Sequence, residues 1–367
     1  MIMALAASWR PAPADPRFQI ASFPAATPPS ASSFTSHVVE RPPGVGEVHG
    51  SSLVVLPNNE RLMVFFGGTH ETALDVRLYQ SRFQRGQWQP ATPLISPAEA
   101  GQAACRYTRR VGNSSMIRDD AGRLHLFFVS VGYFGWSCSS LNQMTSTDDG
   151  KSWSPPLRLL TTPFFNVSTL VRSPAVPLQD GGFLLPAYIE ITNKFPEVLQ
   201  FDAHGKFVRK VRMSDQHGSL QACLLPINGQ QAYAYERNRF YRSTPRLKVQ
   251  ETHDGGRTWS AVSTIEVHNE DSPVAVVQVE PDLYLMAYNP THDREKLELA
   301  YSRNGIDWKT FKTLEYMPLT TRQKVIEFSY PTMLRQGDSI DLVYTWHRQG
   351  IKHCRFNVTW LKEQIHD

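Results

Sequence analysis

The stretch S-T-D-D-G-K-S-W at residues 146–153 has a second copy, T-H-D-G-G-R-T-W, at residues 252–259. Both fit the pattern S/T-x-D-x-G-x-x-W. In such a turn the aspartate can accept hydrogen bonds from backbone amides, and the glycine supplies a positive φ. The tryptophan offers a large apolar ring for packing between neighbouring elements. We therefore assign both boxes to stabilisation of the fold and not to catalysis.

Weaker copies of this box extend along the chain. They read S-R-F-Q-R-G-Q-W at 81–88, F-D-A-H-G-K-F at 201–207 and S-R-N-G-I-D-W at 302–308. The turn glycines Gly86, Gly150, Gly205, Gly256 and Gly305 are therefore separated by 64, 55, 51 and 49 residues. Short runs such as RLMVFF, RLHLFFV and IDLVYTW alternate apolar and polar residues, which is typical of antiparallel strands. A repeat near 50 residues predicts an all-β propeller, with five boxed blades and a sixth closed by the chain ends.

Composition narrows the class of protein. The 367 residues are 41% hydrophobic and 20% charged, as in globular domains, and the net charge is only +4. We expect no nucleic-acid binding, because no dense run of lysine and arginine occurs. The four cysteines (Cys105, Cys138, Cys223 and Cys354) form no CxxC pair, and GGTHE lacks the HExxH spacing of a zinc hydrolase. We therefore expect no metal site and no cofactor.

The N-terminal part differs from the rest of the chain. Residues 1–45 are rich in Pro, Ala and Ser, which predicts an extended and poorly ordered arm leading into a propeller at 46–367. The start, MIMALAASWR, is neither a convincing signal peptide nor a membrane span. It is compatible with a trimmed leader or with a membrane-anchored partner. An exported or periplasmic location is preferred to the cytoplasm, and the oligomeric state stays open.

Several segments resemble the sialidase (neuraminidase) superfamily, above all its bacterial branch of BNR or Asp-box proteins. The resemblance covers roughly residues 45–360. It is carried by GEVHGSSLVVL, VFFGGTHETALD, RRVGNSSM, NVSTLVRSP, LMAYNPTHDREKLELAYS, EFSYPTM and VYTWHRQGIKH. The Asp boxes are specific for the fold and much less so for an activity, since propellers host many functions.

The resemblance implies a retaining glycosidase whose nucleophile is a tyrosine instead of a carboxylate. An anomeric carbon that already bears a carboxylate would repel an attacking carboxylate, whereas a phenol avoids this repulsion. Tyr330 in FSYPTM stands where such enzymes place the tyrosine. Arg294 in DREKLELAYS and Arg237 in YAYERNR match two arginines that hold the substrate carboxylate.

Two positions depart from the family pattern. The strand that usually carries the first arginine reads V-H-G-S, with His49, which is either a structural histidine or a catalytic base. The glutamate that usually activates the tyrosine is replaced by Gln221, which cannot act as a base. The residues that could compensate are the arginines Arg109, Arg172 and Arg348 and the glutamates Glu190, Glu236 and Glu327.

The acid/base carboxylate of the family belongs on the loop after the first pair of strands. This loop offers Glu71, which we prefer, and Asp75 as the second candidate; the two could instead orient an arginine. Asn113 in VGNSSM is a further candidate, as an amide that faces the ligand.

These observations lead to three hypotheses. The first is a glycoside hydrolase that releases a terminal acidic sugar, either sialic acid or a related ulosonic acid such as Kdo, from a glycan. The second is a polysaccharide lyase for glycans that contain uronic acids, in which His49, Tyr330 and Arg294 act on the substrate. The third is a propeller that binds glycans without catalysis.

Overall fold

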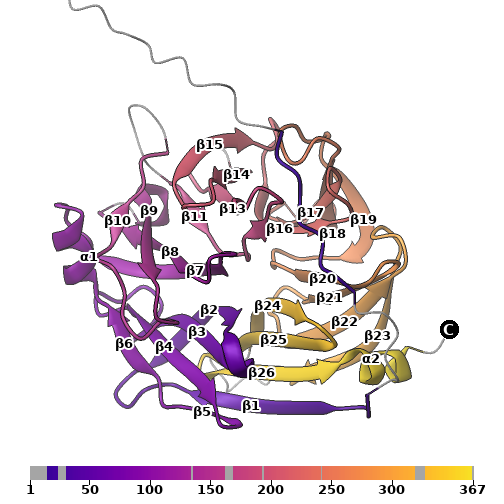
Figure 1. Ribbon diagram of the computed structural model, residues 1–367, viewed down its shortest axis with the longest axis horizontal. Helices are drawn as coiled ribbons and strands as arrows, with labels where there is room; N and C mark the ends of the chain where they lie inside the picture. The colour runs from indigo at the N-terminus through magenta and orange to yellow at the C-terminus, as the bar shows by residue number, and fades with distance from the viewer. Residues whose placement is uncertain are drawn as a thin grey trace, which may run out of the picture.

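A computed structural model describes residues 15–23, 30–133, 135–161, 168–191, 194–240, 242–318 and 327–365. Its sheets are arranged as six blades around a central axis (Figure 1). The predicted all-β, six-bladed propeller is therefore confirmed. Residues 1–14 and 24–29 of the expected arm, which include the N-terminal apolar run, lie outside the described residues.

The first three blades follow one another along the chain. Blade 1 contains β2 (Glu47–Val55), β3 (Arg61–Gly68), β4 (Arg77–Gln84), β5 (Gln87–Trp88) and β6 (Thr92–Ile95). Blade 2 contains β7 (Arg110–Arg118), β8 (Leu124–Val131), β9 (Ser139–Ser146) and β10 (Leu157–Arg158). Blade 3 contains β11 (Leu170–Val171), β12 (Val176–Pro177), β13 (Phe183–Ile189), β14 (Phe195–Phe201) and β15 (Phe207–Arg212).

The other three blades complete the ring. Blade 4 contains β16 (Ser219–Pro226), β17 (Ala232–Asn238), β18 (Arg246–Thr252) and β19 (Ser263–His268). Blade 5 contains β20 (Ala275–Glu280), β21 (Leu283–Tyr288), β22 (Lys296–Ser302) and β23 (Trp308–Tyr316). Blade 6 contains β24 (Phe328–Gln336), β25 (Ser339–Trp346), β26 (Gly350–Asn357) and β1 (Phe34–Glu40). The helices are short: η1 (Pro57–Asn59), α1 (Pro97–Ala103), η2 (Gly135–Cys138) and α2 (Val358–Gln364).

The Asp-box turns perform the structural task that their residues predict. Asp148 accepts hydrogen bonds from the backbone N–H of Ser152 (2.9 Å) and from the hydroxyl groups of Ser146 (2.7 Å) and Ser152 (2.6 Å). Gly150 follows with φ +81°, which an L side chain rarely adopts. Trp153 reaches the preceding blade, where its indole N–H donates to the side-chain oxygen of Gln80 at 3.0 Å. This turn thus fixes blade 2 against blade 1.

Blade 6 closes the ring because strands from both ends of the described chain pair in one sheet. Strand β1 pairs antiparallel with β26, with Phe34 opposite Phe356 and Glu40 opposite Gly350. The closing blade expected from the chain ends is therefore present. Strand β1 lies within the range 1–45 that was expected to form an arm, so the sheet of the propeller begins before residue 46.

A buried ionic cluster joins blades 1 and 6. The Arg61 guanidinium, which is 0% exposed, donates to both carboxylate oxygens of Asp341 at 3.0 and 3.1 Å. The indole N–H of Trp88 donates to Nδ1 of His353 (3.2 Å), and Nε2 of the same ring lies 2.8 Å from Asp341. Nδ1 is therefore the accepting nitrogen, and the neutral ring donates from Nε2 to the carboxylate. Asp341 is thus the shared anion of this cluster.

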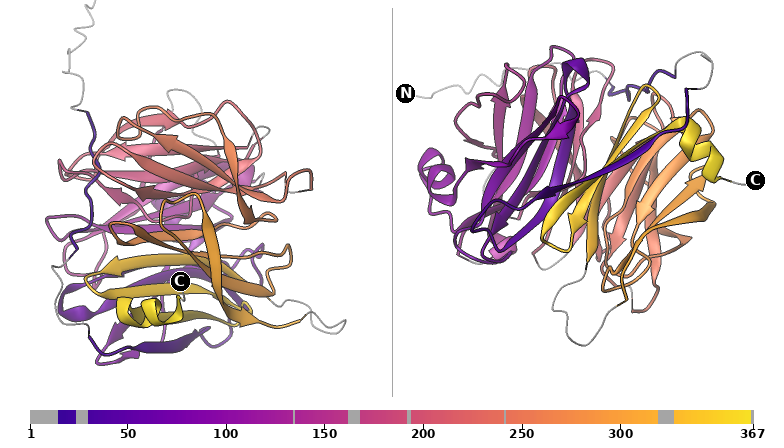
Figure 2. Two further views of the ribbon diagram at one scale, coloured as in Figure 1. Left: turned by 90° about the vertical axis from the view of Figure 1, so that its right-hand side faces the viewer. Right: turned by 90° about the horizontal axis from the view of Figure 1, so that it is seen from below.

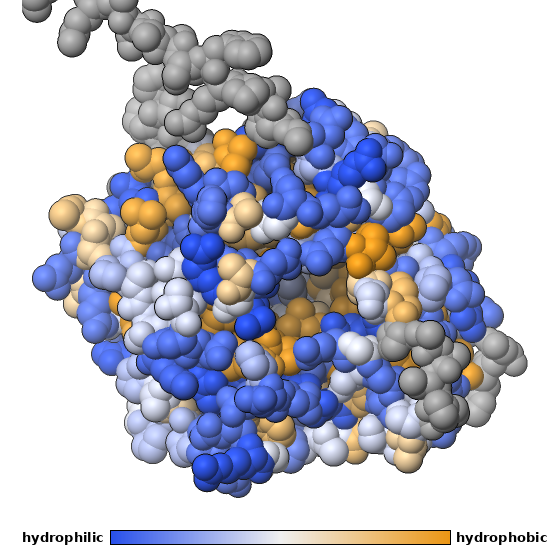
Figure 3. All heavy atoms as spheres, viewed as in Figure 1, coloured by the Kyte–Doolittle hydropathy of each residue, from blue (hydrophilic) through white to orange (hydrophobic). Residues whose placement is uncertain are grey.

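The two ends of the strands define two faces of the disc, which Figure 2 shows from the side. Residues 15–23 cross the face seen in Figure 1, where Phe18 forms an isolated bridge with Leu178. This face is hollowed at its centre, with hydrophobic residues around the hollow (Figure 3). A pocket of about 660 Å³ beside this N-terminal stretch is lined by residues that include Ile20, Leu224 and Met333.

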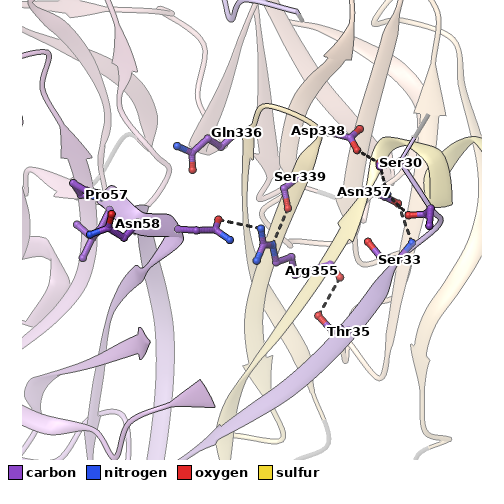
Figure 4. A pocket seen from close by; sticks show the side chains of 13 residues that line it. Ser30, Ser33, Thr35, Pro57, Asn58, Gln336, Asp338, Ser339, Arg355 and Asn357 are labelled. Atoms are coloured by element: carbon purple, nitrogen blue, oxygen red, sulfur yellow. Dashed lines mark hydrogen bonds between the residues drawn. The ribbon is translucent and has the colours of Figure 1, made fainter. Parts of the chain in front are cut away.

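A second pocket, of about 620 Å³, lies at the junction of β1, β26 and the turn around Asn58 (Figure 4). Its wall includes Arg355, which donates to Ser339 (2.8 Å) and to Asn59 (3.0 Å). These contacts tie blade 6 to the first turn of blade 1. The pocket belongs to the closure of the ring and is lined by none of the candidate site residues.

Candidate functional site

The candidate site lies where the inner strands of the blades begin, on the face opposite the N-terminal stretch. Four of these strands have a register shift near their start: after His49 in β2, Gly112 in β7, Leu220 in β16 and Ser329 in β24. Each shift contains one residue with positive φ, and these residues are Gly50, Asn113, Gln221 and Tyr330. Three of them are not glycine, and strain of this kind is concentrated at functional sites.

Tyr330 occupies the centre of this region, with φ 56° and 9% of its surface exposed. The Arg237 guanidinium lies 3.3 Å from the phenol oxygen, to which it donates. The guanidinium carbons of Arg172 and Arg294 are 5.4 and 5.3 Å from the ring centroid. The His49 ring lies edge-on to the phenol, with 4.3 Å between the centroids. The structure thus brings Tyr330, Arg237 and Arg294 together, as the sequence predicts.

Arg237 is held in place by blades 4 and 5. Its Nε donates to Asp271 at 2.7 Å, and its Nη1 donates to the side-chain oxygen of Gln221 at 3.0 Å. Burial by itself lowers the pKa of Arg237, but the nearby Tyr330 and Asp271 raise this pKa above its ordinary value. Arg237 therefore stays charged beside the phenol.

Arg172 has a different environment. It is 4% exposed, and its guanidinium donates to the main-chain carbonyls of Val274 (3.5 Å) and Pro331. Within the described residues it pairs with no carboxylate. Burial lowers the pKa of Arg172 to about 10, which still leaves it protonated at neutral pH. A buried cation without a counter-ion is costly, so it favours an anionic group nearby.

His49 lies between Tyr330 and a group of charged residues from blade 6. Its Nδ1 is 2.9 Å from the Thr345 hydroxyl and 3.8 Å from Glu327. Burial lowers the pKa of His49 to about 4, against the opposing attraction of Glu327. The imidazole is therefore neutral at pH 7. A neutral ring can accept a proton.

Glu327 balances the cations in this part of the site. It binds Arg294 at 3.4 Å and is also paired with Arg348. Burial raises the pKa of Glu327, but His49, Arg348 and Arg294 together bring it down to about 2. Of the three glutamates expected to compensate for Gln221, Glu327 is the one that joins the site. Glu190 pairs with Lys194 at 3.0 Å, and Glu236 is buried within blade 4, where burial raises its pKa to about 7.

Loop 69–76 carries both carboxylates that the sequence offers as an acid. Glu71 accepts a hydrogen bond from Arg348 at 2.8 Å, and the same Arg348 nitrogen lies 3.3 Å from Glu47. Burial raises the pKa of Glu71, but His49 and Arg348 bring the net pKa below its ordinary value. Asp75 accepts from the backbone N–H and the hydroxyl of Thr69, so it holds the loop. Glu71, and not Asp75, thus lies beside His49 and Arg348, and it is ionised while Arg348 binds it.

Of the remaining predicted residues, Asn113 and Gln221 join the site and Arg109 does not. Asn113 and Gln221 both donate from their side-chain amides to the Tyr188 hydroxyl, each at 3.1 Å. Arg109 is exposed and lines a separate pocket beside α1. Its neighbour Arg110 reaches loop 69–76, where it donates to the Thr72 carbonyl at 2.8 Å.

Comparison with known sequences assigns the chain to a family. The sequence profile of BNR repeat-like domains matches residues 60–343, well over half of the chain. The chain belongs to the BNR repeat-like domain family. No curated protein matches this BNR repeat-like chain in sequence.

Solved structures share the fold of this BNR repeat-like domain. The Hadza microbial sialidase Hz136 superposes with a TM-score of 0.73 at 14% identity, over 88% of this chain and 68% of that one. A protein of unknown function from Dyadobacter fermentans gives 0.67 at 14% identity, over 88% and 97% of the two chains. The NanB sialidase from Streptococcus pneumoniae gives 0.66 at 10% identity, over 93% and 71%. At such identities the likeness establishes the fold alone.

Sequence reasoning missed three residues of this BNR repeat-like site: Tyr188, Asp271 and Thr345. Tyr188 stands in LPAYI and looks like a core aromatic, although its hydroxyl joins Asn113 to Gln221. Asp271 stands in an inter-blade connection with φ 61° and binds Arg237 and Arg239. The available signal for Asp271 was its place just before the apolar run VAVVQV at 274–279. Among the described residues, no cluster of three metal-ligating side chains was found.

Proposed function

We propose that the protein is a glycoside hydrolase that releases a terminal acidic sugar, such as sialic acid or Kdo, with retention of configuration. The observation that carries this proposal is the phenol of Tyr330 among the guanidinium groups of Arg172, Arg237 and Arg294. Cations around a neutral nucleophile suit a substrate whose reacting carbon bears a carboxylate. Two of the structural relatives described above are named as sialidases, which supports the same reading.

In this proposal His49 supplies the base that Gln221 cannot supply. The phenol gives its proton to the neutral imidazole, and the phenol oxygen bonds to the anomeric carbon as the bond from that carbon to the leaving oxygen breaks. Water then displaces the phenol oxygen from the anomeric carbon, which releases the sugar and restores Tyr330. Thr345 and Glu327 hold the other ring nitrogen, at 2.9 and 3.8 Å, and Glu327 offsets the positive charge that develops on the ring. Arg237 and Arg294 then orient the substrate carboxylate.

The leaving oxygen needs a proton, and Glu71 is the proposed donor. In the free site its bond to Arg348 favours the carboxylate form. We therefore infer that bound substrate turns Arg348 away from Glu71, so that the pKa of Glu71 can rise and the carboxyl can take up a proton. Asp75 remains with Thr69 and holds the loop.

A lyase is the second candidate, and one specific observation favours it. The neutral His49 lies against Tyr330, while residue 221 provides no carboxylate base. Such a pair could remove a proton next to a uronic acid carboxylate that Arg294 neutralises. The two reactions differ in their products, because elimination leaves a C4–C5 double bond that absorbs in the ultraviolet and hydrolysis does not.

The test is incubation with α-sialosides, Kdo glycosides and uronic-acid oligosaccharides, followed by mass spectrometry and ultraviolet absorbance. Release of a free acidic sugar supports hydrolysis. An absorbing, unsaturated product supports the lyase instead. Binding without any product would overturn both enzymes and favour a glycan-binding propeller.

The pH dependence of turnover should reflect the ionisation of His49. Because burial lowers the pKa of His49 from 6.5 to about 4, kcat/KM should fall on acidification only as the pH approaches 4. His49→Asn, which retains a donor toward Thr345, should lower kcat by about 10²-fold to 10⁴-fold and abolish this acidic limb. A limb near pH 6.5 in the unmodified protein would contradict the lowered pKa of His49. An unchanged profile in the variant would exclude His49 as the base.

A further inference from the structure

Large hydrophobic side chains are exposed mainly on one face of the propeller. Twelve of the described residues belong to this class, and eight of them lie at the end of the blades that carries the candidate site. Their exposed fractions range from 37% to 71%. Among them are Leu74, Tyr107, Tyr133, Ile191, Phe240 and Tyr316. The other two are Leu160 and Met317, and we call the eight residues together the rim.

The strand register fixes the place of the rim. Tyr133 follows the end of β8, where Val131 pairs with Arg110 at the start of β7. Tyr316 pairs with Lys296, two residues after Arg294 of the site. The four other exposed hydrophobic residues, Phe34, Val38, Leu157 and Val208, belong to the outer strands β1, β10 and β15. The exposed apolar surface is therefore concentrated around the candidate site.

The shape and chemistry of the rim resemble those of an interfacial surface. Its side chains come from separate loops of different blades, so they surround the site instead of lining one groove. Tyr107 and Tyr133 stack with 4.4 Å between ring centroids and leave both rings exposed. Exposed Arg109 lies two residues from Tyr107, and the Lys248 ammonium lies 5.8 Å from the Phe240 ring. Aromatic rings beside basic groups suit the boundary between lipid headgroups and water.

We propose that this face docks on the surface of a lipid bilayer, and that the acidic glycan cleaved at Tyr330 is carried by a membrane lipid. The second clause rests on the proposed function, whereas the docking itself does not. Rim side chains would insert at the headgroup boundary, and the basic groups would add attraction to anionic lipids. The site would then face the sugars that project from the membrane. A protein partner on the same face is the alternative that the test must separate.

The docking test is co-sedimentation with vesicles of phosphatidylcholine, alone and with one quarter phosphatidylglycerol. The triple variant Leu74→Ser/Tyr133→Ser/Phe240→Ser should bind at least about tenfold more weakly than the unmodified protein. The control is Leu157→Ser/Val208→Ser, which removes two exposed hydrophobic side chains (62% and 36%) from outer strands and should bind normally. Thermal unfolding checks that both variants are folded. No co-sedimentation of the unmodified protein, or equal binding by the triple variant, would overturn the proposal and favour a protein partner.

Turnover of a membrane-bound and a soluble substrate tests docking and the proposed function separately. The unmodified protein should release the acidic sugar faster from a glycolipid in vesicles than from the same glycan in solution. The triple variant should lose that preference and keep its turnover of the soluble glycan. Vesicle binding without release from either substrate would overturn the proposed function while docking stands. Equal rates on both substrates, with no binding, would overturn docking alone.

Discussion

Tyr330→Phe should lower kcat on an acidic-sugar glycoside on the order of 10³-fold or more, with little change in stability. The substitution removes the phenol oxygen that is proposed to attack the anomeric carbon and leaves the ring among Arg172, Arg294 and His49. The hydrogen bond from Arg237 is also lost, but that guanidinium keeps Asp271 and Gln221 as partners. The measurement is the rate of sugar release under saturating substrate, with thermal unfolding as the check on folding.

The matched control for this experiment is Tyr235→Phe. Tyr235 is also a buried tyrosine, and its hydroxyl donates to the Gly305 carbonyl at 2.6 Å, within the packing between blades. Its removal should cost roughly 1 kcal/mol of stability and leave turnover intact. Unaltered turnover in Tyr330→Phe would exclude Tyr330 as the nucleophile. Equal losses in both variants would point to a general effect on folding.

Asp341→Ala should destabilise the protein by about 3–5 kcal/mol. The substitution leaves the fully buried Arg61 without its counter-ion and removes the acceptor for His353. Because these groups join blades 1 and 6, the loss should also weaken closure of the ring. The measurement is the free energy of unfolding from urea denaturation at neutral pH.

An exposed ion pair provides the comparison for Asp341. Asp282 and Arg303 lie 3.8 Å apart on the surface, so Asp282→Ala should cost less than about 1 kcal/mol. The double variant Arg61→Met/Asp341→Leu should recover much of the loss, since it removes both charges together. A loss below 1 kcal/mol in Asp341→Ala would show that Arg61 finds another partner.

The fold could be predicted because its main signal is local. Four of the five box turns carry a hydrogen-bonding aspartate or asparagine, and all five carry a glycine with positive φ, so the pattern is visible without tertiary information. The spacing of the boxes then determines the number of blades. Residues 34–40 carry no such box, and their place in blade 6 depends on pairing with β26, which is distant in sequence.

The site was less predictable than the fold because it depends on which side chains of each strand and loop point into the site. Tyr330, Arg237 and Arg294 could be located by resemblance, and the structure brings them together. The sequence suggested Arg109, whereas its neighbour Arg110 reaches loop 69–76, since adjacent side chains on a strand face opposite ways. Tyr188 was invisible for another reason. A tyrosine in an apolar strand looks the same whether its hydroxyl meets the core or two amides of a site.

Ring closure by β1 and β26 also constrains how the protein folds during synthesis. Thr35 and Arg355 share a hydrogen bond across 320 residues of sequence, so blade 6 cannot form until the ribosome has made almost all of the described chain. Until then β1 is an unpaired edge, and such edges are prone to aggregate. Contacts of this range slow folding, because the entropy of a very long loop must be lost before the strands meet. Nascent chains that end before β26 should therefore depend most on chaperones.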